Sequence, residues 1–197
     1  MSRAGCAWRC GEGREDGPRW NQPEEISLAP FTAAVFRREL FDKVGLLEER
    51  FESYLEDVDF GLRCALAGFR GAYEPEAVAR HHGSSTLGKW DPEKVRLIAR
   101  NQVLLVAKHY PKGWWRRLGW PVLVGQLLWG MVALRHGAGG AWCKGKLEGL
   151  RLFRTHRGDG RREIGVVEML SESERRIRRL QAEDGFERYW RWYFTLT

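Results

Sequence analysis

The spacing of apolar residues predicts two helices in the first half of the chain. From residue 58 onward, apolar residues recur every three or four positions, which is the pattern of one buried helix face. These residues are Val58, Leu62, Ala65, Leu66 and Phe69. Gly68 is expected to end this helix. A shorter helix is predicted over residues 37–44, where Gly45 occupies the position of a left-handed C-cap.

Short extended segments are expected beside these helices. Residues 31–36 (FTAAVF) are rich in strand-favouring side chains, and residues 71–73 and 77–80 also suit short extended segments. The polar run at 81–86 (HHGSST) is typical of a loop. This mixture predicts compact α/β structure over residues 28–110.

Two long helices are predicted next. One begins at Asp91-Pro92-Glu93, which supplies an acidic N-cap and a proline in the first turn, and it ends before Pro111. The other contains residues 118–134 (LGWPVLVGQLLWGMVAL), which carry no formal charge and are flanked by arginines. A run of seventeen residues is at the short limit for spanning a bilayer, and Pro121 and Gln126 weaken the case for a span.

Tryptophans surround this apolar run, at positions 114, 115, 120, 129 and 142. Tryptophan and arginine are enriched where a helix meets the membrane–water interface. We therefore expect residues 111–170 to form membrane-associated helices that lie in or dip into the interface rather than span the bilayer. A buried core helix is the alternative, because apolar runs of this length are common in protein cores.

The last segment, residues 171–197, is predicted to be a basic helix followed by an aromatic tail. Ser171 and Glu174 have the spacing of a capping box, and the helix is expected to run to about Glu183. The run at 186–194 (FERYWRWYF) then places six aromatics in nine residues. Aromatics among arginines can stack on single-stranded nucleic acid or sit at a membrane interface. The neighbouring apolar segment favours the membrane.

Composition and charge narrow the classes of function. The 197 residues carry a formal net charge of +7, and most of the basic excess follows Arg96, which favours an anionic partner for the second half. Residues 1–27 carry almost no aliphatic side chains and are expected to be a flexible lead-in without a secretory signal. The four cysteines are too few and too scattered for a disulfide scaffold, and the C-x3-C pair at Cys6 and Cys10 does not suit zinc.

Three acids, Glu56, Asp57 and Asp59, lie at the start of the helix predicted from residue 58. Asp57-Val58-Asp59 has the D-x-D spacing of a metal clamp, but two positions on a helix are about 200° apart. The two carboxylates therefore point to different sides, which disfavours a shared metal. Acids at a helix N-terminus are also stabilised by the macrodipole and the free N–H groups, so capping alone would explain them.

Five motifs extend this picture beyond capping. In chain order they are AAVFRRELFDKVG, LLEERF, SYLEDVDFGLRCALAGFR, YEPEAVARHHGSSTLG and LIARNQVLLVAKHYP. Together they resemble the acceptor-side half of a family 2 glycosyltransferase of the bacterial rhamnosyltransferase-like kind, from about residue 33 to 88 and more loosely to the C-terminus. The resemblance implies an inverting enzyme that transfers a sugar from a nucleotide-sugar donor to a saccharide or lipid-linked acceptor in cell-surface polysaccharide synthesis.

The resemblance also implies roles for the three acids. In the family, the Asp of a Glu-Asp pair heads a helix beneath the acceptor pocket and acts as the catalytic base, which corresponds here to Asp57 with Glu56 as its neighbour. Asp59 is the reserve candidate for the base. Crowding of the carboxylates is expected to raise one apparent pKa, and the sequence does not identify which.

A second group of candidates lies in the loop after residue 80. The resemblance implies that His81, or else His82, helps to bind the divalent cation (Mg or Mn) of the donor, together with a D-x-D from an N-terminal half. Solvent exposure is the alternative for both histidines. A run of hydroxyls could donate hydrogen bonds to phosphate or sugar oxygens of the donor. These residues are Ser84, Ser85 and Thr86.

The chain also departs from the family. The nucleotide-binding half, with its βαβ units and metal-binding D-x-D, has no counterpart before Phe31. We therefore expect an α/β fold that is a partial GT-A-like (nucleotide-diphospho-sugar transferase) domain lacking this half, followed by a mainly helical C-terminal region. Such a chain would have little activity alone. Its exposed apolar surfaces would favour self-association or membrane binding.

These expectations place the protein in the cytoplasm, peripheral to the cytoplasmic face of the inner membrane. A nucleic-acid partner is not expected. Two alternatives remain open at this point: a non-enzymatic basic protein that binds a membrane surface or nucleic acid, and a metal-dependent hydrolase. The hydrolase would need four side chains to converge on one ion: Asp57, Asp59, His81 and His82.

Overall fold

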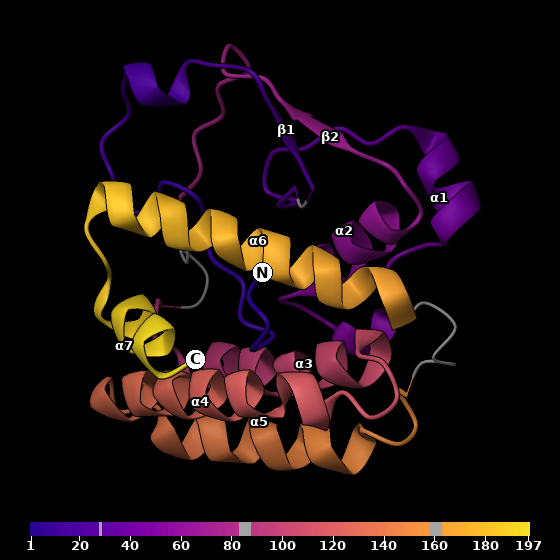
Figure 1. The fold of residues 1–197 in the computed structure, drawn as a ribbon, viewed down its shortest axis with the longest axis vertical. Coiled ribbons are helices and arrows are strands. Elements are labelled where there is room, and N and C mark those ends of the chain that lie inside the picture. The colour runs from indigo at the N-terminus through magenta and orange to yellow at the C-terminus, as the bar shows by residue number, and fades with distance from the viewer. Residues whose placement is uncertain (28, 83–87, 158–162) are drawn as a thin grey trace. The chain divides into compact units, whose positions relative to one another are not determined.

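The structure is a computed structural model that describes residues 1–27, 29–82, 88–157 and 163–197. The chain divides into two compact units (Figure 1). We call Arg9–Thr86 the α2 unit, and Met1–Trp8 together with Leu87–Thr197 the helical unit. Each is described separately.

The α2 unit contains short elements joined by turns. In chain order they are η1 (Pro18–Trp20), β1 (Glu24–Ile26), α1 (Arg38–Val44), η2 (Glu49–Phe51), α2 (Glu56–Leu66) and β2 (Gly71–Tyr73). The two predicted helices are confirmed as α1 and α2. Gly45 ends α1 and donates its N–H to the Phe41 carbonyl. Its φ of 83° is a left-handed conformation that glycine adopts without strain.

The predicted strand at residues 31–36 does not form. Its two phenylalanines pack instead against rings from the helices. Phe31 and Phe36 meet edge to face at 4.7 Å, and both contact Phe60 of α2, at 5.6 and 5.5 Å between ring centroids. The aromatic side chains that suggested a strand therefore pack against α2 instead. Edge-to-face contacts between rings do not require the backbone of residues 31–36 to pair with another strand.

Among the described residues of this unit, the sheet is one antiparallel pair of strands. β1 and β2 pair in the register Glu24 with Tyr73, Glu25 with Ala72 and Ile26 with Gly71. Residues 71–73 are extended as predicted, whereas residues 77–80 form no strand. Every residue of β2 is exposed, and an isolated pair of strands is marginal in water. The partial GT-A-like fold stays a prediction.

The described residues of the helical unit form five helices. They are α3 (Pro92–His109), α4 (Trp115–Arg135), α5 (Gly139–Leu152), α6 (Glu163–Asp184) and α7 (Arg188–Leu196). The predicted start of α3 is confirmed, because the Asp91 carboxylate accepts from the Glu93 and Lys94 N–H groups at 2.8 and 3.3 Å. Helix α3 ends at His109, before Pro111.

Glycines allow α3 and α5 to pack closely. Gly145 and Gly149 are buried on one face of α5, four residues apart. A Cβ added at Gly145 would lie 2.1 Å from the Arg96 carbonyl oxygen, and one at Gly149 would lie 2.7 Å from Cβ of Val103. Neither space could hold a methyl group, so the two backbones approach because these positions lack side chains.

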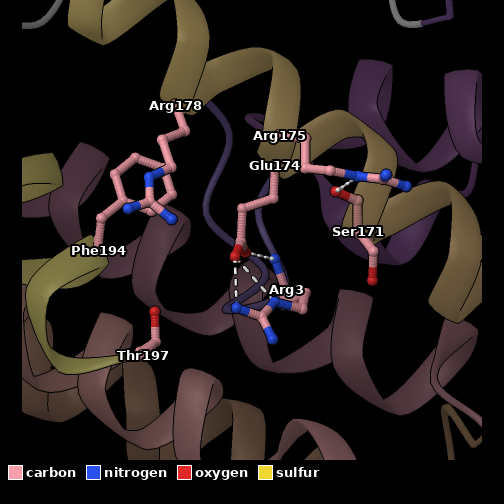
Figure 2. Close-up of a pocket in the computed structure, with 7 residues that line it drawn as sticks. All are labelled: Arg3, Ser171, Glu174, Arg175, Arg178, Phe194 and Thr197. Atoms are coloured by element: carbon pink, nitrogen blue, oxygen red, sulfur yellow. Dashed lines mark hydrogen bonds and ion pairs between the residues drawn. The ribbon is translucent and has the colours of Figure 1, made fainter.

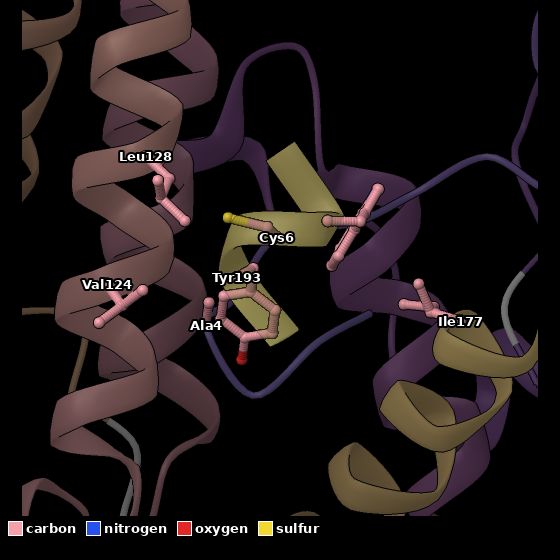
Figure 3. Close-up of a cluster of buried hydrophobic side chains, with 7 residues drawn as sticks. Ala4, Cys6, Val124, Leu128, Ile177 and Tyr193 are labelled. Carbon is pink, nitrogen blue, oxygen red and sulfur yellow. The ribbon is translucent and has the colours of Figure 1, made fainter. Parts of the chain in front are cut away.

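The first residues of the chain form part of the core of this unit. Ala4 and Cys6 are buried against Val124 and Leu128 of α4, with α6 and α7 on the other side (Figure 3). The Gln126 amide of α4 donates to the Ala4 carbonyl at 2.7 Å. The structure thus differs from the expected flexible lead-in over residues 1–8, because Ala4 and Cys6 pack among apolar side chains that only the folded helices bring together.

Helix α6 begins earlier than predicted and crosses the expected capping box. Ser171 lies inside the helix, where its hydroxyl donates to the Val167 carbonyl at 2.8 Å. The Glu174 carboxylate is buried and accepts from Arg3, both from the backbone N–H and from the guanidinium (Figure 2). Glu174 therefore fastens the start of the chain to α6 rather than capping a helix.

The aromatic tail forms α7 and supplies core rings. Trp190 and Tyr193 are buried, and the Tyr193 hydroxyl donates to Glu174 at 2.8 Å. Phe194 stacks on Trp190 with ring centroids 5.8 Å apart, while Trp192 stays exposed. These buried rings are not a stacking platform for nucleic acid, nor are they free to enter a membrane.

A buried polar network joins α3, α4 and α5. The Lys146 ammonium donates to the Ala99 carbonyl at 3.0 Å, to the Gln102 side chain at 2.9 Å and to the Gln126 side chain. Burial lowers the pKa of Lys146 to about 7, although the nearby Cys6 opposes this shift. The amine is therefore held where its charge is costly, by acceptors from three helices.

Replacing the glycine at the closest approach should destabilise the helical unit. We expect Gly145→Ala to lower the free energy of unfolding by about 3 kcal/mol, because a backbone oxygen occupies the space of the new methyl. Gly140→Ala is the matched control in α5, since nothing lies within 4 Å of its added Cβ and alanine favours a helix. Urea unfolding followed by circular dichroism measures both. Equal effects of the two substitutions would contradict the close packing.

Lys146 should make stability depend on pH. Its folded pKa of about 7 lies below the ordinary value of 10.5, so the unfolded chain binds the extra proton between these values. Stability should therefore rise with pH from 7 to 8.5, and Lys146 contributes at most about 1.4 kcal/mol per unit to this rise. Burial also lowers the pKa of the Met1 ammonium, from 8.0 to about 5, and this group adds to the slope below about pH 8. Urea midpoints at fixed pH values measure the slope, and Lys146→Met should reduce it and leave the part due to Met1. An unchanged slope in the variant would assign it to other groups.

Candidate active site at the start of α2

The backbone before α2 adopts an unusual conformation. Tyr54 and Leu55 both have φ of 68°, and Glu52 has φ of 57°, although none of them is glycine. Left-handed φ costs a side-chain-bearing residue of order 1–3 kcal/mol, and such residues cluster at functional sites. Leu55 is the N-cap residue, and its carbonyl accepts from the Asp59 N–H at 2.9 Å to begin the helix. This strained turn therefore determines where α2 begins, and with it the position of Glu56 and Asp57 in the first helical turn.

The pKa of Glu56 is raised above its ordinary value. Desolvation raises the pKa of its carboxyl, and the charge of Asp57 raises it further, against a backbone hydrogen bond that lowers it. Its Oε2 atom is buried and has no hydrogen-bond partner among the described residues. Burial is thus the main cause of the raised pKa, and the crowding predicted from the sequence is the smallest of the three contributions.

Asp57 is half-buried and oriented by the backbone. Its Oδ1 accepts from the Val58 N–H at 2.8 Å. That contact turns the carboxylate toward the mouth of the helix, where the macrodipole and the first N–H groups favour negative charge. An oriented carboxylate of this kind can accept a proton from a hydroxyl held beside it.

Asp59 has a structural partner instead. It is fully buried, and its Oδ2 accepts from Arg63 Nε at 3.0 Å in an i,i+4 ion pair. A catalytic base must be able to contact its substrate, so the burial of Asp59 argues against its predicted role as the reserve base. As the helix geometry predicted, Asp57 and Asp59 do not share a site: one faces the N-terminal turn and the other the interior.

Arg63 joins α2 to the end of α1. Beyond Asp59, its guanidinium donates to the carbonyls of Val44, Gly45 and Leu46. These acceptors lie at the C-terminus of α1, where a cation is favoured by the helix dipole. Sequence analysis missed this role, although an arginine four residues after an aspartate in a helix was a usable signal.

The histidine loop does not complete a metal site among the described residues. His81 and His82 are both exposed. Throughout the described ranges, no group of three or more His, Cys, Asp or Glu side chains could hold a metal ion. These residues therefore do not fit a divalent cation by themselves, and the four-ligand site of a hydrolase is not formed there. The three hydroxyl candidates, Ser84, Ser85 and Thr86, lie outside the described residues.

A pocket of about 200 Å³ also lies within the helical unit (Figure 2). Arg175 and Arg178 stand at its rim, and Arg3 faces Glu174 inside it. The Arg178 guanidinium lies over the Phe194 ring, 5.7 Å from its centroid. The inner charges already neutralise each other, so the charged groups that the pocket presents to a ligand are the exposed arginines.

Comparison with known proteins gives a partial match. No protein-family model matches the chain, and no solved structure matches it significantly. N-acetylglucosaminyl-diphospho-decaprenol L-rhamnosyltransferases from two strains of Mycobacterium tuberculosis are each 38% identical to it over 85 residues. The match covers 42% of this chain and 26% of the relatives, so the chain spans about a quarter of their length. The chain is thus related to a glycosyltransferase over part of its length.

Breaking the buried ion pair should loosen α2. Arg63→Met removes the ion-pair partner of the buried Asp59 carboxylate, which costs about 3 kcal/mol or more. We expect hydrogen exchange of the α2 amides to accelerate on the order of 100-fold. Arg37→Met is the control, because its ion pair with Glu39 is exposed and worth little. Exchange that is no faster than in the control would contradict a structural role for Asp59.

Proposed function

We propose that the α2 unit is the acceptor-binding part of an inverting glycosyltransferase, with Asp57 as the catalytic base. The observation that carries the proposal is the 38% identity over 85 residues to a rhamnosyltransferase. The strained turn before α2 supports the location of the site. It places Glu56 and Asp57 at the start of the helix, and helix capping alone would not require left-handed residues there.

The proposed reaction is a single displacement. Asp57 removes the proton from an acceptor hydroxyl as that oxygen attacks the anomeric carbon of the donor sugar. The bond from this carbon to the nucleoside diphosphate breaks, and the leaving group takes the electron pair. The configuration at the anomeric carbon is inverted. One oriented carboxylate suffices for the proton transfer.

Asp57 suits this role better than its neighbours. Asp59 is fully buried in its pair with Arg63, and the Glu56 carboxyl is desolvated, which raises its pKa. Asp57 is only half-buried, and its carboxylate is oriented by the Val58 N–H.

The acceptor we propose is a saccharide or a lipid-linked saccharide. The relatives are named for rhamnose transfer to N-acetylglucosaminyl-diphospho-decaprenol, a lipid-linked amino sugar. By this likeness we propose rhamnose, supplied by a nucleotide-sugar donor, as the first sugar to test. No residue of the described structure is assigned to the donor or to its divalent cation.

The proposal predicts loss of transfer in an Asp57 variant. The test is a chimera in which residues 28–110 replace the corresponding segment of the M. tuberculosis rhamnosyltransferase. We expect this chimera to transfer labelled rhamnose to N-acetylglucosaminyl-diphospho-decaprenol, and Asp57→Asn to reduce transfer at least about 100-fold, because no base remains.

Asp42→Asn, an exposed acid of α1, is the matched control and should leave transfer unchanged. Circular dichroism should show that both variants fold as the parent chimera does. Transfer within about threefold of the parent in Asp57→Asn would refute the assignment of the base. A parent chimera that folds but transfers nothing would refute the acceptor-side role itself.

A further inference from the structure

Helix α4 has an outer face that is continuously apolar. Its exposed residues recur every three or four positions and form one stripe, which we call the outer stripe. They are Trp120, Leu123, Leu127, Met131 and Leu134, each at least half exposed. A soluble helix normally turns polar side chains to solvent at such positions, so this stripe requires an apolar or interfacial partner.

The opposite face of α4 is committed to the protein. Val124 and Leu128 pack in the core cluster, and a Cβ added at Gly125 would lie 2.3 Å from Cβ of Ala4. Gln126 is held by the Ala4 carbonyl and by Lys146. Among the described helices, α4 is the one long and apolar enough to cross a membrane, but 39% of that window is buried inside the protein.

Basic residues border the outer stripe without acidic ones. Helix α4 contains no Asp or Glu, and Arg116, Arg117 and Arg135 flank the stripe at its two ends. Exposed tryptophans also lie near its start: Trp115, and Trp120, whose indole donates to the Leu196 carbonyl of α7. Apolar side chains between arginines and tryptophans match the composition of helices that lie in a membrane interface.

The adjoining helix continues the same chemistry. In α5, which follows α4 after a short turn, Leu147 and Leu150 are exposed. Lys144 and Arg151 are exposed on the same helix. Figure 1 shows α4 and α5 side by side. The two helices thus offer apolar side chains together with cations, which suits an anionic surface.

We propose that the outer stripe of α4 docks onto an anionic phospholipid bilayer, with the helix lying parallel to the surface. A second copy of this chain fits less well, because pairing two such faces would bring arginines together without acids to neutralise them. A full span is also disfavoured. The stripe is about 21 Å long, shorter than the hydrocarbon core, and the partly buried Gln126–Lys146 contact holds the other face in the protein.

The first test is binding to vesicles by flotation. The full chain should float with vesicles of phosphatidylglycerol and phosphatidylcholine and much less with phosphatidylcholine alone. We expect Leu127→Gln/Met131→Gln to weaken binding about tenfold or more, because the stripe loses its apolar centre. Arg116→Gln/Arg117→Gln should weaken it by a similar factor and reduce its dependence on salt.

The matched control is Leu46→Gln/Val78→Gln, which removes two exposed apolar residues of the α2 unit, 76% and 79% exposed. It should bind as the parent does. Binding that is insensitive to the stripe variant, or equally reduced by the control, would overturn the proposal. So would a stripe-dependent dimer in analytical ultracentrifugation with no binding to vesicles, since a second copy would then occupy the face.

The second test distinguishes lying from spanning. Exposed Cys10 and Cys143 are first replaced by serine, and single labels are placed through Trp120→Cys, Leu127→Cys and Leu134→Cys. Quenching by lipids brominated at known depths should give the same shallow depth at all three positions. A depth that changes by about 20 Å from position 120 to position 134 would refute the parallel orientation.

Discussion

The buried pair of Asp59 and Arg63 is the constraint on which the candidate site depends. The ion pair is closed at 3.0 Å inside α2, and Arg63 also binds the carbonyls at the end of α1. A buried charge pair of this kind does not give large net stability, but it penalises every arrangement in which either charge lacks its partner. The register of α2 is therefore fixed. That register turns Asp59 inward and leaves Glu56 and Asp57 at the helix mouth, so one acid stabilises the fold and its two neighbours are available for chemistry.

How far the sequence predicted this structure depends on the range of the interactions involved. Helices α1 and α3 were predictable because their ends depend on Gly45 and Asp91, whose hydrogen bonds reach only a few residues along the chain. Residues 31–36 misled because aromatic content favours both a strand and a ring cluster, and Phe60 decides between them. Ser171 misled in the same way: the capping spacing is present, but the helix begins eight residues earlier, at Glu163.

The candidate site shows the same division. The divergence of Asp57 and Asp59 followed from helix periodicity alone. The raised pKa of Glu56 did not, because its main cause is desolvation, which depends on how the folded chain covers that carboxyl. The left-handed turn at Tyr54 and Leu55 could not be predicted from the sequence, because glycine or asparagine normally occupies such positions and neither is present there. Strain of this kind persists only where the surrounding structure holds it in place, which is why it marks the site more clearly in coordinates than in sequence.

The helical unit resolves the ambiguity of its apolar segment by using both faces of α4. The sequence permitted either a core helix or an interfacial helix. A single helix can be both, because one of its faces can pack in the core while the opposite face stays exposed. Here the close approach of Ala4 at Gly125 and the hydrogen bond from the half-buried Gln126 to the Ala4 carbonyl hold one side of α4 against the protein. Lys146 then requires acceptors from α3 and α4 at once, which prevents α4 from leaving the bundle without exposing a costly amine to lipid. The exposed apolar residues on the other side therefore cannot be buried by inserting all of α4 into a bilayer. They can be covered only when another surface docks onto that face while α4 stays in the bundle.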